Sequence, residues 1–129
     1  MEAYKKRIAT LTDCADYADA WLIIGMRYII YPWKGPQKTI DDFKRIADEF
    51  NGYGAICKKN GLRFAYHPHD YPYKPVDGQL PIDVLLANTD NDLVDFQMDF
   101  YYTVTEGQNP EAYIKKMRRG SGYAICATC

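Results

Sequence analysis

The sequence lacks the patterns that mark membrane, secreted or nucleic-acid-binding proteins. Its 129 residues contain no run of the roughly 20 apolar residues that crosses a bilayer. The N-terminal segment MEAYKKRIAT has no apolar centre of the kind found in signal peptides. The formal net charge is −1, and the densest basic run, Lys115 to Arg119, suits a solvated helix end. We therefore expect neither a membrane nor a nucleic acid as partner.

Histidine is scarce, and both copies fall within ten residues. The stretch FAYHPHDYPY at 64–73 contains His67 and His69 on either side of a proline, with Asp70 next. Histidine suits proton transfer near neutral pH because its unperturbed pKa is about 6.5. The chain also has 12 tyrosines. Such enrichment is typical of sites that stack on ligands and equally of ordinary packing.

Strand-like and helix-like segments alternate along the chain. A Thr39 cap with Asp42 three residues later predicts a helix start, and so does Asn109 followed by Pro110. Alternation of this kind favours βα units and a parallel sheet in an α/β fold. Strands are predicted over 27–31, 62–66 and 94–102, and helices over 11–24, 40–60, 81–88 and 110–116.

The two later strands each have an apolar and a polar face, because successive side chains alternate. Phe64 and Tyr66 share one face of their strand, whereas Asp95, Gln97 and Asp99 share the polar face of the next. Strands of an open doubly wound sheet are covered on both sides and should be apolar throughout. Polar side chains toward the C-terminal strand ends favour instead the mouth of a (β/α) barrel.

The stretch FAYHPHDYPY, with LLANTDNDLVDFQMDFYY and GQNPEAYIKK after it, resembles the sugar phosphate isomerase/epimerase family of xylose-isomerase-like TIM barrels. RYIIYPW and FKRIADEFNGYGAICKKNGLRF upstream are also similar, so the resemblance covers about residues 11 to 116. The paired signature of His-x-His-Asp followed by Asn-Thr-Asp and Met-Asp is specific. It implies a partial (β/α) barrel of about three to four βα units in a domain over 1–116.

The resemblance implies site residues at the barrel mouth. His67 and His69 match two histidines that line the substrate site, and we expect them to be catalytic. Trp33, Gln97 and Tyr102 are expected to bind the substrate, Trp33 by stacking on a sugar face. The histidines and Trp33 have simpler alternatives. The histidines would be hydrogen-bonded residues at the rim, and Trp33 would be a packing residue. Two aspartates are expected to be turn residues, Asp70 and Asp90.

A divalent metal is the cofactor that the resemblance implies, with Asp99 as a ligand. Mn, Zn, Fe, Co or Mg would suit such a site. The chain departs from the family at Pro72 and Gln97, where glutamate is common, and at Tyr102, where tryptophan is common. The alternative for Asp99 is a helix cap or an ion pair with a lysine.

The implied function is metal-assisted proton transfer on a small sugar or sugar phosphate, as in an isomerase or epimerase. One alternative is a catalytically incomplete fragment or binding remnant. Another is an endonuclease of the abasic-site type on the same barrel, which the absence of a basic surface disfavours. Of the four cysteines, Cys14 and Cys57 fall in helix-like segments with no pairing pattern, so we expect a reducing cytoplasm.

The chain has about half of the roughly 250 residues of a complete barrel. Open edges of a partial sheet favour self-association. The segment 117–129, which includes RRGSGYAICATC, does not resemble the family. One hypothesis is translation out of frame from about Met117, which the nucleotide sequence of the gene tests. The alternative is a redox or zinc half-site at Cys126 and Cys129, for which no second pair of ligands exists.

Overall fold

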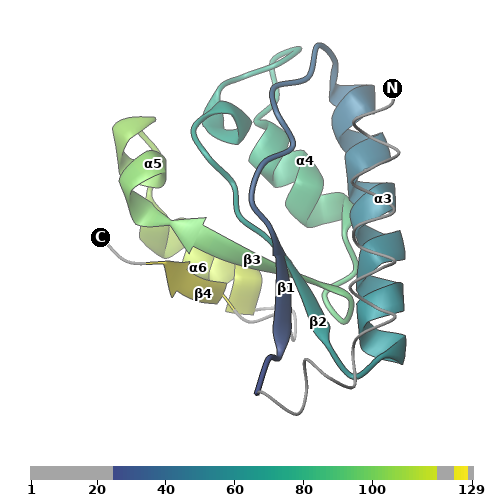
Figure 1. Cartoon of the computed structure of the whole chain (residues 1–129). Coiled ribbons are helices and arrows are strands. Elements are labelled where there is room, and N and C mark those ends of the chain that lie inside the picture. The colour runs from purple at the N-terminus through teal and green to yellow at the C-terminus, as the bar shows by residue number, and fades with distance from the viewer. Residues whose placement is uncertain (1–24, 119–123, 128–129) are drawn as a thin grey trace.

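The computed structural model describes residues 25–118 and 124–127, where helices alternate with the strands of one parallel sheet (Figure 1). The predicted α/β fold is therefore confirmed; the helix predicted over 11–24 lies outside the described residues. In chain order the elements are β1 (Tyr28–Tyr31), α3 (Ile40–Lys59), β2 (Arg63–Tyr66), the 3₁₀ turn η1 (Tyr71–Tyr73), α4 (Pro81–Asn88), β3 (Val94–Asp99), α5 (Phe100–Thr105), α6 (Pro110–Arg118) and β4 (Ala124–Ala127).

The strands lie in the order β1-β2-β3-β4, and every neighbouring pair is parallel. Phe64 of β2 is in register with Ile29 of β1 and with Val94 of β3. The strand β4 comes from the segment that does not resemble the family, and it pairs with β3. Because all four strands run the same way, their carboxyl ends share one edge of the sheet.

The long helix α3 begins and ends where its sequence indicates. Thr39 caps it through a full capping box with Asp42, and Lys58 and Lys59 occupy its last turn beside the negative end of the helix dipole. Gly54 allows α3 to approach the sheet closely, since a β-carbon at this position would clash with the backbone of Leu93. The predicted start of α6 is also confirmed: the side chain of Asn109 accepts a hydrogen bond from the amide of Glu111 (2.9 Å).

The apolar face of the sheet packs on α3 and α4, which Figure 1 shows on the same side of the strands. Phe50 of α3 lies with its ring 5.5 Å from that of Phe64 and 4.7 Å from that of Tyr66. Phe64, Tyr66 and Phe96 are all buried. The predicted apolar face is therefore confirmed, and it leaves the polar face of β2 and β3 on the other side.

The third strand is shorter than predicted. It ends at Asp99, and Phe100–Thr105 form α5, so Tyr102 lies on a helix. The side chain of Asp99 accepts a hydrogen bond from the amide of Tyr101 (2.9 Å), and the hydroxyl of Thr103 bonds the carbonyl of Asp99 (3.1 Å). This cap overrides the strand preference of aromatic and β-branched residues. Among the described residues, no helix is long and apolar enough to cross a membrane.

Candidate functional site at the carboxyl edge of the sheet

Three strand ends bring the predicted site residues to one edge. Trp33 comes two residues after the end of β1, His67 directly after β2, and Asp99 at the end of β3. The backbone amide of His67 donates to the carbonyl of Tyr31 (3.0 Å), so β-type pairing continues one step past β2. This edge corresponds to the face of a (β/α) barrel where active sites lie.

His67 is anchored to the neighbouring strand. Its Nδ1 lies 3.0 Å from the main-chain carbonyl oxygen of Gln97. A carbonyl oxygen only accepts hydrogen bonds, so Nδ1 carries the proton that is donated. In the neutral ring Nε2 is then the acceptor. Gln97 thus acts on His67 through its backbone.

His69 contacts three aromatic rings at once. From the centroid of the His69 ring, the distances to the ring centroids of His67, Trp33 and Tyr102 are 4.9, 5.0 and 5.3 Å. The first two contacts are edge-to-face, at 82° in both cases. Among the described residues, its imidazole makes no hydrogen bond in addition to these contacts. The structure therefore gathers the two predicted catalytic histidines with two of the three predicted substrate-binding residues.

Trp33 is part packing and part open surface, as both of its predicted roles require. The residue is 41% exposed, while its ring makes edge-to-face contacts with the rings of His69 and Tyr71; the Tyr71 ring lies 5.1 Å away at 79°. Sequence reasoning missed Tyr71. Its position two residues after His69, in an aromatic run, was the available signal.

Asp99 caps α5, as its alternative role predicted. It is two residues past Gln97 on the same strand face, which places its Cα about 7 Å farther along the strand. Within residues 25–118 and 124–127, no group of three or more His, Cys, Asp or Glu side chains could hold a metal ion. The described residues therefore do not assemble a metal site by themselves, and the role of Asp99 as a ligand stays a prediction.

Behind the site lies a layer of buried tyrosine hydroxyls. The hydroxyls of Tyr66 and Tyr71 form a hydrogen bond. Burial raises the pKa of both phenols, with the neighbouring Tyr71 adding to the effect on Tyr66. Burial also raises the pKa of Tyr73 to about 12. These hydroxyls are consequently neutral at physiological pH and act as hydrogen-bond partners.

A partly buried ion pair occupies the other end of the polar face, and sequence reasoning missed it. The guanidinium of Arg63 binds the carboxylate of Asp95 through two bonds, Nε–Oδ2 at 2.5 Å and a terminal nitrogen to Oδ1 at 2.7 Å. The Asp95 side chain is 0% exposed. Both hydrogen-bonding to Asp95 and its charge raise the pKa of Arg63. Their adjacent places on the polar faces of β2 and β3 were the available signal.

Asp70 and Asp90 lie in turns, as expected. Asp70 precedes the turn η1 and accepts a hydrogen bond from Lys74 (2.6 Å), which lowers the pKa of its carboxyl. Asp90 accepts a hydrogen bond from the amide of Asp92 (2.8 Å). Neither belongs to the histidine and tryptophan cluster.

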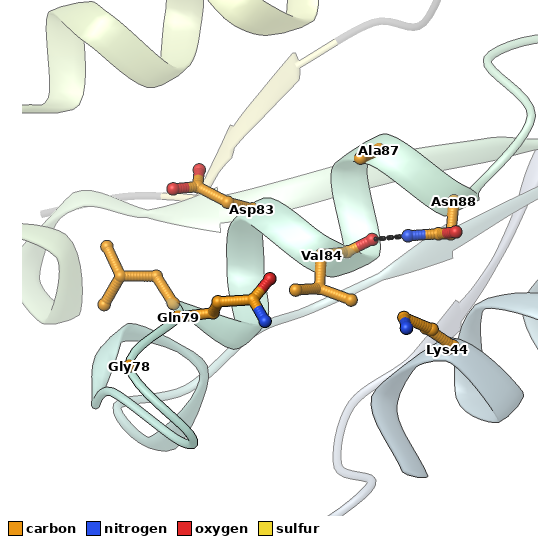
Figure 2. A pocket seen from close by; sticks show the side chains of 8 residues that line it. Lys44, Gly78, Gln79, Asp83, Val84, Ala87 and Asn88 are labelled. Carbon is orange, nitrogen blue, oxygen red and sulfur yellow. Dashed lines mark hydrogen bonds between the residues drawn. The ribbon is translucent and has the colours of Figure 1, made fainter. Parts of the chain in front are cut away.

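A separate hollow of about 480 Å³ lies on the helix side of the sheet (Figure 2). Lys44 of α3 and residues of the segment 78–88 line it, and it includes none of the predicted site residues. Several of its polar groups already have partners. Asn88 donates to the carbonyl of Val84 (2.7 Å), and Lys44 to Asp41 (3.0 Å). The side chains of His67, His69 and Trp33 lie at the carboxyl edge of the sheet instead.

Two solved structures match this fold over most of the chain. Both are structures of sugar phosphate isomerase/epimerases from Parabacteroides distasonis. One is 25% identical with a TM-score of 0.72. The other is 28% identical with a TM-score of 0.73. The chain resembles sugar phosphate isomerase/epimerases.

The match covers 84% and 82% of this chain but 43% and 42% of the two structures. The chain therefore spans less than half the length of the proteins it resembles, as expected of a partial barrel. Comparisons with protein-family models and with curated proteins found no match.

Proposed function

We propose that this chain carries the sugar-binding and proton-transfer part of a sugar or sugar phosphate isomerase or epimerase. The observation that supports it is the meeting of His67, His69 and Trp33 at the carboxyl edge of a parallel sheet. The names of the two similar structures point to the same class of substrate.

His67 is the proposed general base. Its Nε2 takes the proton from the carbon next to the substrate carbonyl, and the substrate becomes an enediolate. The imidazolium keeps its Nδ1–H bond to the carbonyl of Gln97, which stabilises the positive charge. Return of the proton to the neighbouring carbon, with transfer of the hydroxyl proton from one oxygen of the enediolate to the other, completes an isomerisation. Return to the opposite face of the same carbon, from a second acid, completes an epimerisation.

The aromatic side chains are proposed to bind the sugar. Trp33 offers an exposed ring, and His69 and Tyr102 form a second wall next to it. Gln97 is half-buried, its main chain meets His67, and its side-chain amide is proposed to bind a sugar hydroxyl. A site of this kind combines apolar surface with a few polar groups that fix the orientation of the ligand.

A divalent metal at Asp99 remains part of the proposal, with its other ligands outside the described residues. Such an ion would polarise the oxygen of the substrate. The proton transfer by His67 is formulated without it. We also propose a cytoplasmic location, because Cys14 and Cys57 show no pairing pattern in the sequence.

The test of this function is deuterium uptake by a sugar in heavy water. D-fructose, D-ribulose and their phosphates are incubated with the protein, and loss of the C–H signal next to the carbonyl is followed by NMR. We expect uptake that falls by about a hundredfold or more in His67→Asn, because general-base catalysis is typically worth that much. Asparagine can still donate to the carbonyl of Gln97 but has no basic nitrogen, so this variant isolates the base.

A binding remnant is the second candidate, which the short span of the match favours. Fluorescence titration of Trp33 with the same sugars, in a Trp21→Phe variant, separates the two candidates. Sugar binding without deuterium uptake would support the remnant. Uptake that is unchanged in His67→Asn would contradict the proposed base.

A further inference from the structure

The 3₁₀ turn Tyr71–Tyr73 connects the Trp33 side of the candidate site with its Asp99 and Tyr102 side. It follows His69 after one residue, and all three of its residues are buried. Two backbone bonds fix it: the amide of Tyr73 to the carbonyl of Asp70, and the amide of Lys74 to that of Tyr71, each 3.1 Å. Residues in a 3₁₀ turn are spaced by about 120° around its axis, so Tyr71 and Tyr73 project in different directions.

Tyr71 reaches the segment that follows β1. Its ring lies 5.1 Å from that of Trp33 in an edge-to-face contact and stacks on Phe43 of α3 at 6.5 Å. Its hydroxyl forms a hydrogen bond with that of Tyr66. Burial raises the pKa of Tyr71, and hydrogen bonds from Tyr66 and from the backbone amides of Lys34 and Gly35 partly oppose this rise. The tyrosine therefore holds both the Trp33 ring and the backbone directly after it.

Tyr73 reaches the segment that follows β3. Its hydroxyl lies within hydrogen-bond distance of the Thr103 hydroxyl on α5 (3.0 Å) and of the sulfur of Met98 (3.6 Å). The hydroxyl of Thr103 also lies 3.1 Å from the carbonyl oxygen of Asp99. Tyr73 and Thr103 are 1% and 0% exposed, so water does not replace these bonds.

We propose that the turn Tyr71–Tyr73 is a positioning element, in which Tyr71 fixes the Trp33 side of the site and Tyr73 fixes the Asp99 and Tyr102 side. The two tyrosines flank Pro72 on one short, buried turn, so the spacing between the two sides is set by this turn. If the proposed function holds, this spacing selects the size of sugar that fits. The bracing itself is measured without any substrate, so it stands or fails separately from the reaction.

The test uses the full chain with Trp21→Phe, which leaves Trp33 as its one tryptophan. Tyr71→Phe and Tyr73→Phe are compared in this background, and each removes one hydroxyl while keeping the ring. Acrylamide quenching of Trp33 reports on one side. Amide hydrogen exchange of residues 101–108 reports on the other.

We expect each variant to change one reporter and leave the other unchanged. Tyr71→Phe should increase the quenching of Trp33 and leave exchange in 101–108 unchanged. Tyr73→Phe should accelerate that exchange about fivefold, as loss of one hydrogen bond predicts, and leave quenching unchanged. A general loss of stability would move both reporters in both variants. That outcome, or no change in either reporter, would overturn the proposal.

Discussion

The Nδ1 of His67 lies 3.0 Å from the main-chain carbonyl oxygen of Gln97, on the next strand of the sheet. This bond joins the first residue after β2 to a residue inside β3, so the parallel pairing that builds the sheet also orients the imidazole. A backbone acceptor cannot rotate away, and the side chain at 97 does not affect it. The orientation of His67 is therefore a property of the fold.

Two substitutions at Asp99 separate its cap from its charge. Asparagine caps helices as well as aspartate, so Asp99→Asn should keep the stability of the wild-type protein. Asp99→Ala should lower the free energy of unfolding by about 1 kcal/mol. Urea unfolding followed by circular dichroism measures both.

Metal analysis of the same two variants tests the ligand role of Asp99. If the residue is a ligand, mass spectrometry of the purified wild-type protein shows a bound Mn, Zn or Co that both variants have lost. Equal metal content in all three proteins would leave Asp99 with its structural role alone.

Stability should fall in alkaline solution because of the buried phenols. The pKa of Tyr73 is raised to about 12 by burial, compared with about 10 for an ordinary tyrosine. Between these values the unfolded chain has lost the proton that the folded protein keeps, so rising pH favours unfolding. The contribution is complete below pH 10 and is lost as the pH approaches 12.

Tyr73→Phe checks this dependence. A single tyrosine contributes a slope of at most about 1.4 kcal/mol per pH unit, so the variant should show a flatter decline between pH 10 and 12. The matched control is Tyr101→Phe, because that side chain is 65% exposed. Equal slopes in the two variants would show that Tyr73 is not responsible.

The effects of replacing Arg63 and Asp95 on the free energy of unfolding should not be additive. Arg63→Met removes the cation that binds the buried carboxylate through two bonds and should cost about 3 kcal/mol in the free energy of unfolding. The double variant with Asp95→Leu should recover most of this loss, because two apolar side chains need no compensation. Denaturant titration measures the difference; additive losses would contradict the coupling.

Self-association is predicted from the edges of the sheet. In the described part of the chain, β1 pairs only with β2, and β4 only with β3. Ile30 on β1 is 39% exposed and lies on the face away from α3. Size-exclusion chromatography with light scattering should show species larger than 14.9 kDa, and Ile30→Lys should shift them toward the monomer. A clean wild-type monomer would refute this prediction.

Local signals in the sequence predicted much of the fold. The Thr39–Asp42 capping box and the Asn109-Pro110 start each depend on residues within one helical turn, and both are confirmed. The alternation in β2 and β3 predicted the buried face, because that face is set by the strand period. The end of β3 was misplaced, since FYYTVT prefers a strand and only the bonds of Asp99 and Thr103 make it helical.

The roles of the site residues stay predictions, but their meeting at one edge is observed. Strand alternation and the family resemblance together led us to expect His67, His69 and Trp33 at this edge. The anchoring of His67 by a carbonyl on another strand depends on register, which a single strand does not reveal. The reach of Tyr71 and Tyr73 to opposite sides depends on a 3₁₀ turn of three residues, too short to have a periodic signal.

The most direct test of the account is the tautomer of His67 at a pH where the ring is neutral. Long-range proton–nitrogen correlation NMR on the ¹⁵N-labelled protein shows which ring nitrogen carries the proton. The account predicts the proton on Nδ1, with Nε2 free to accept one, and the same tautomer in His69→Asn. A proton on Nε2 would remove the base from the proposed reaction and contradict the account.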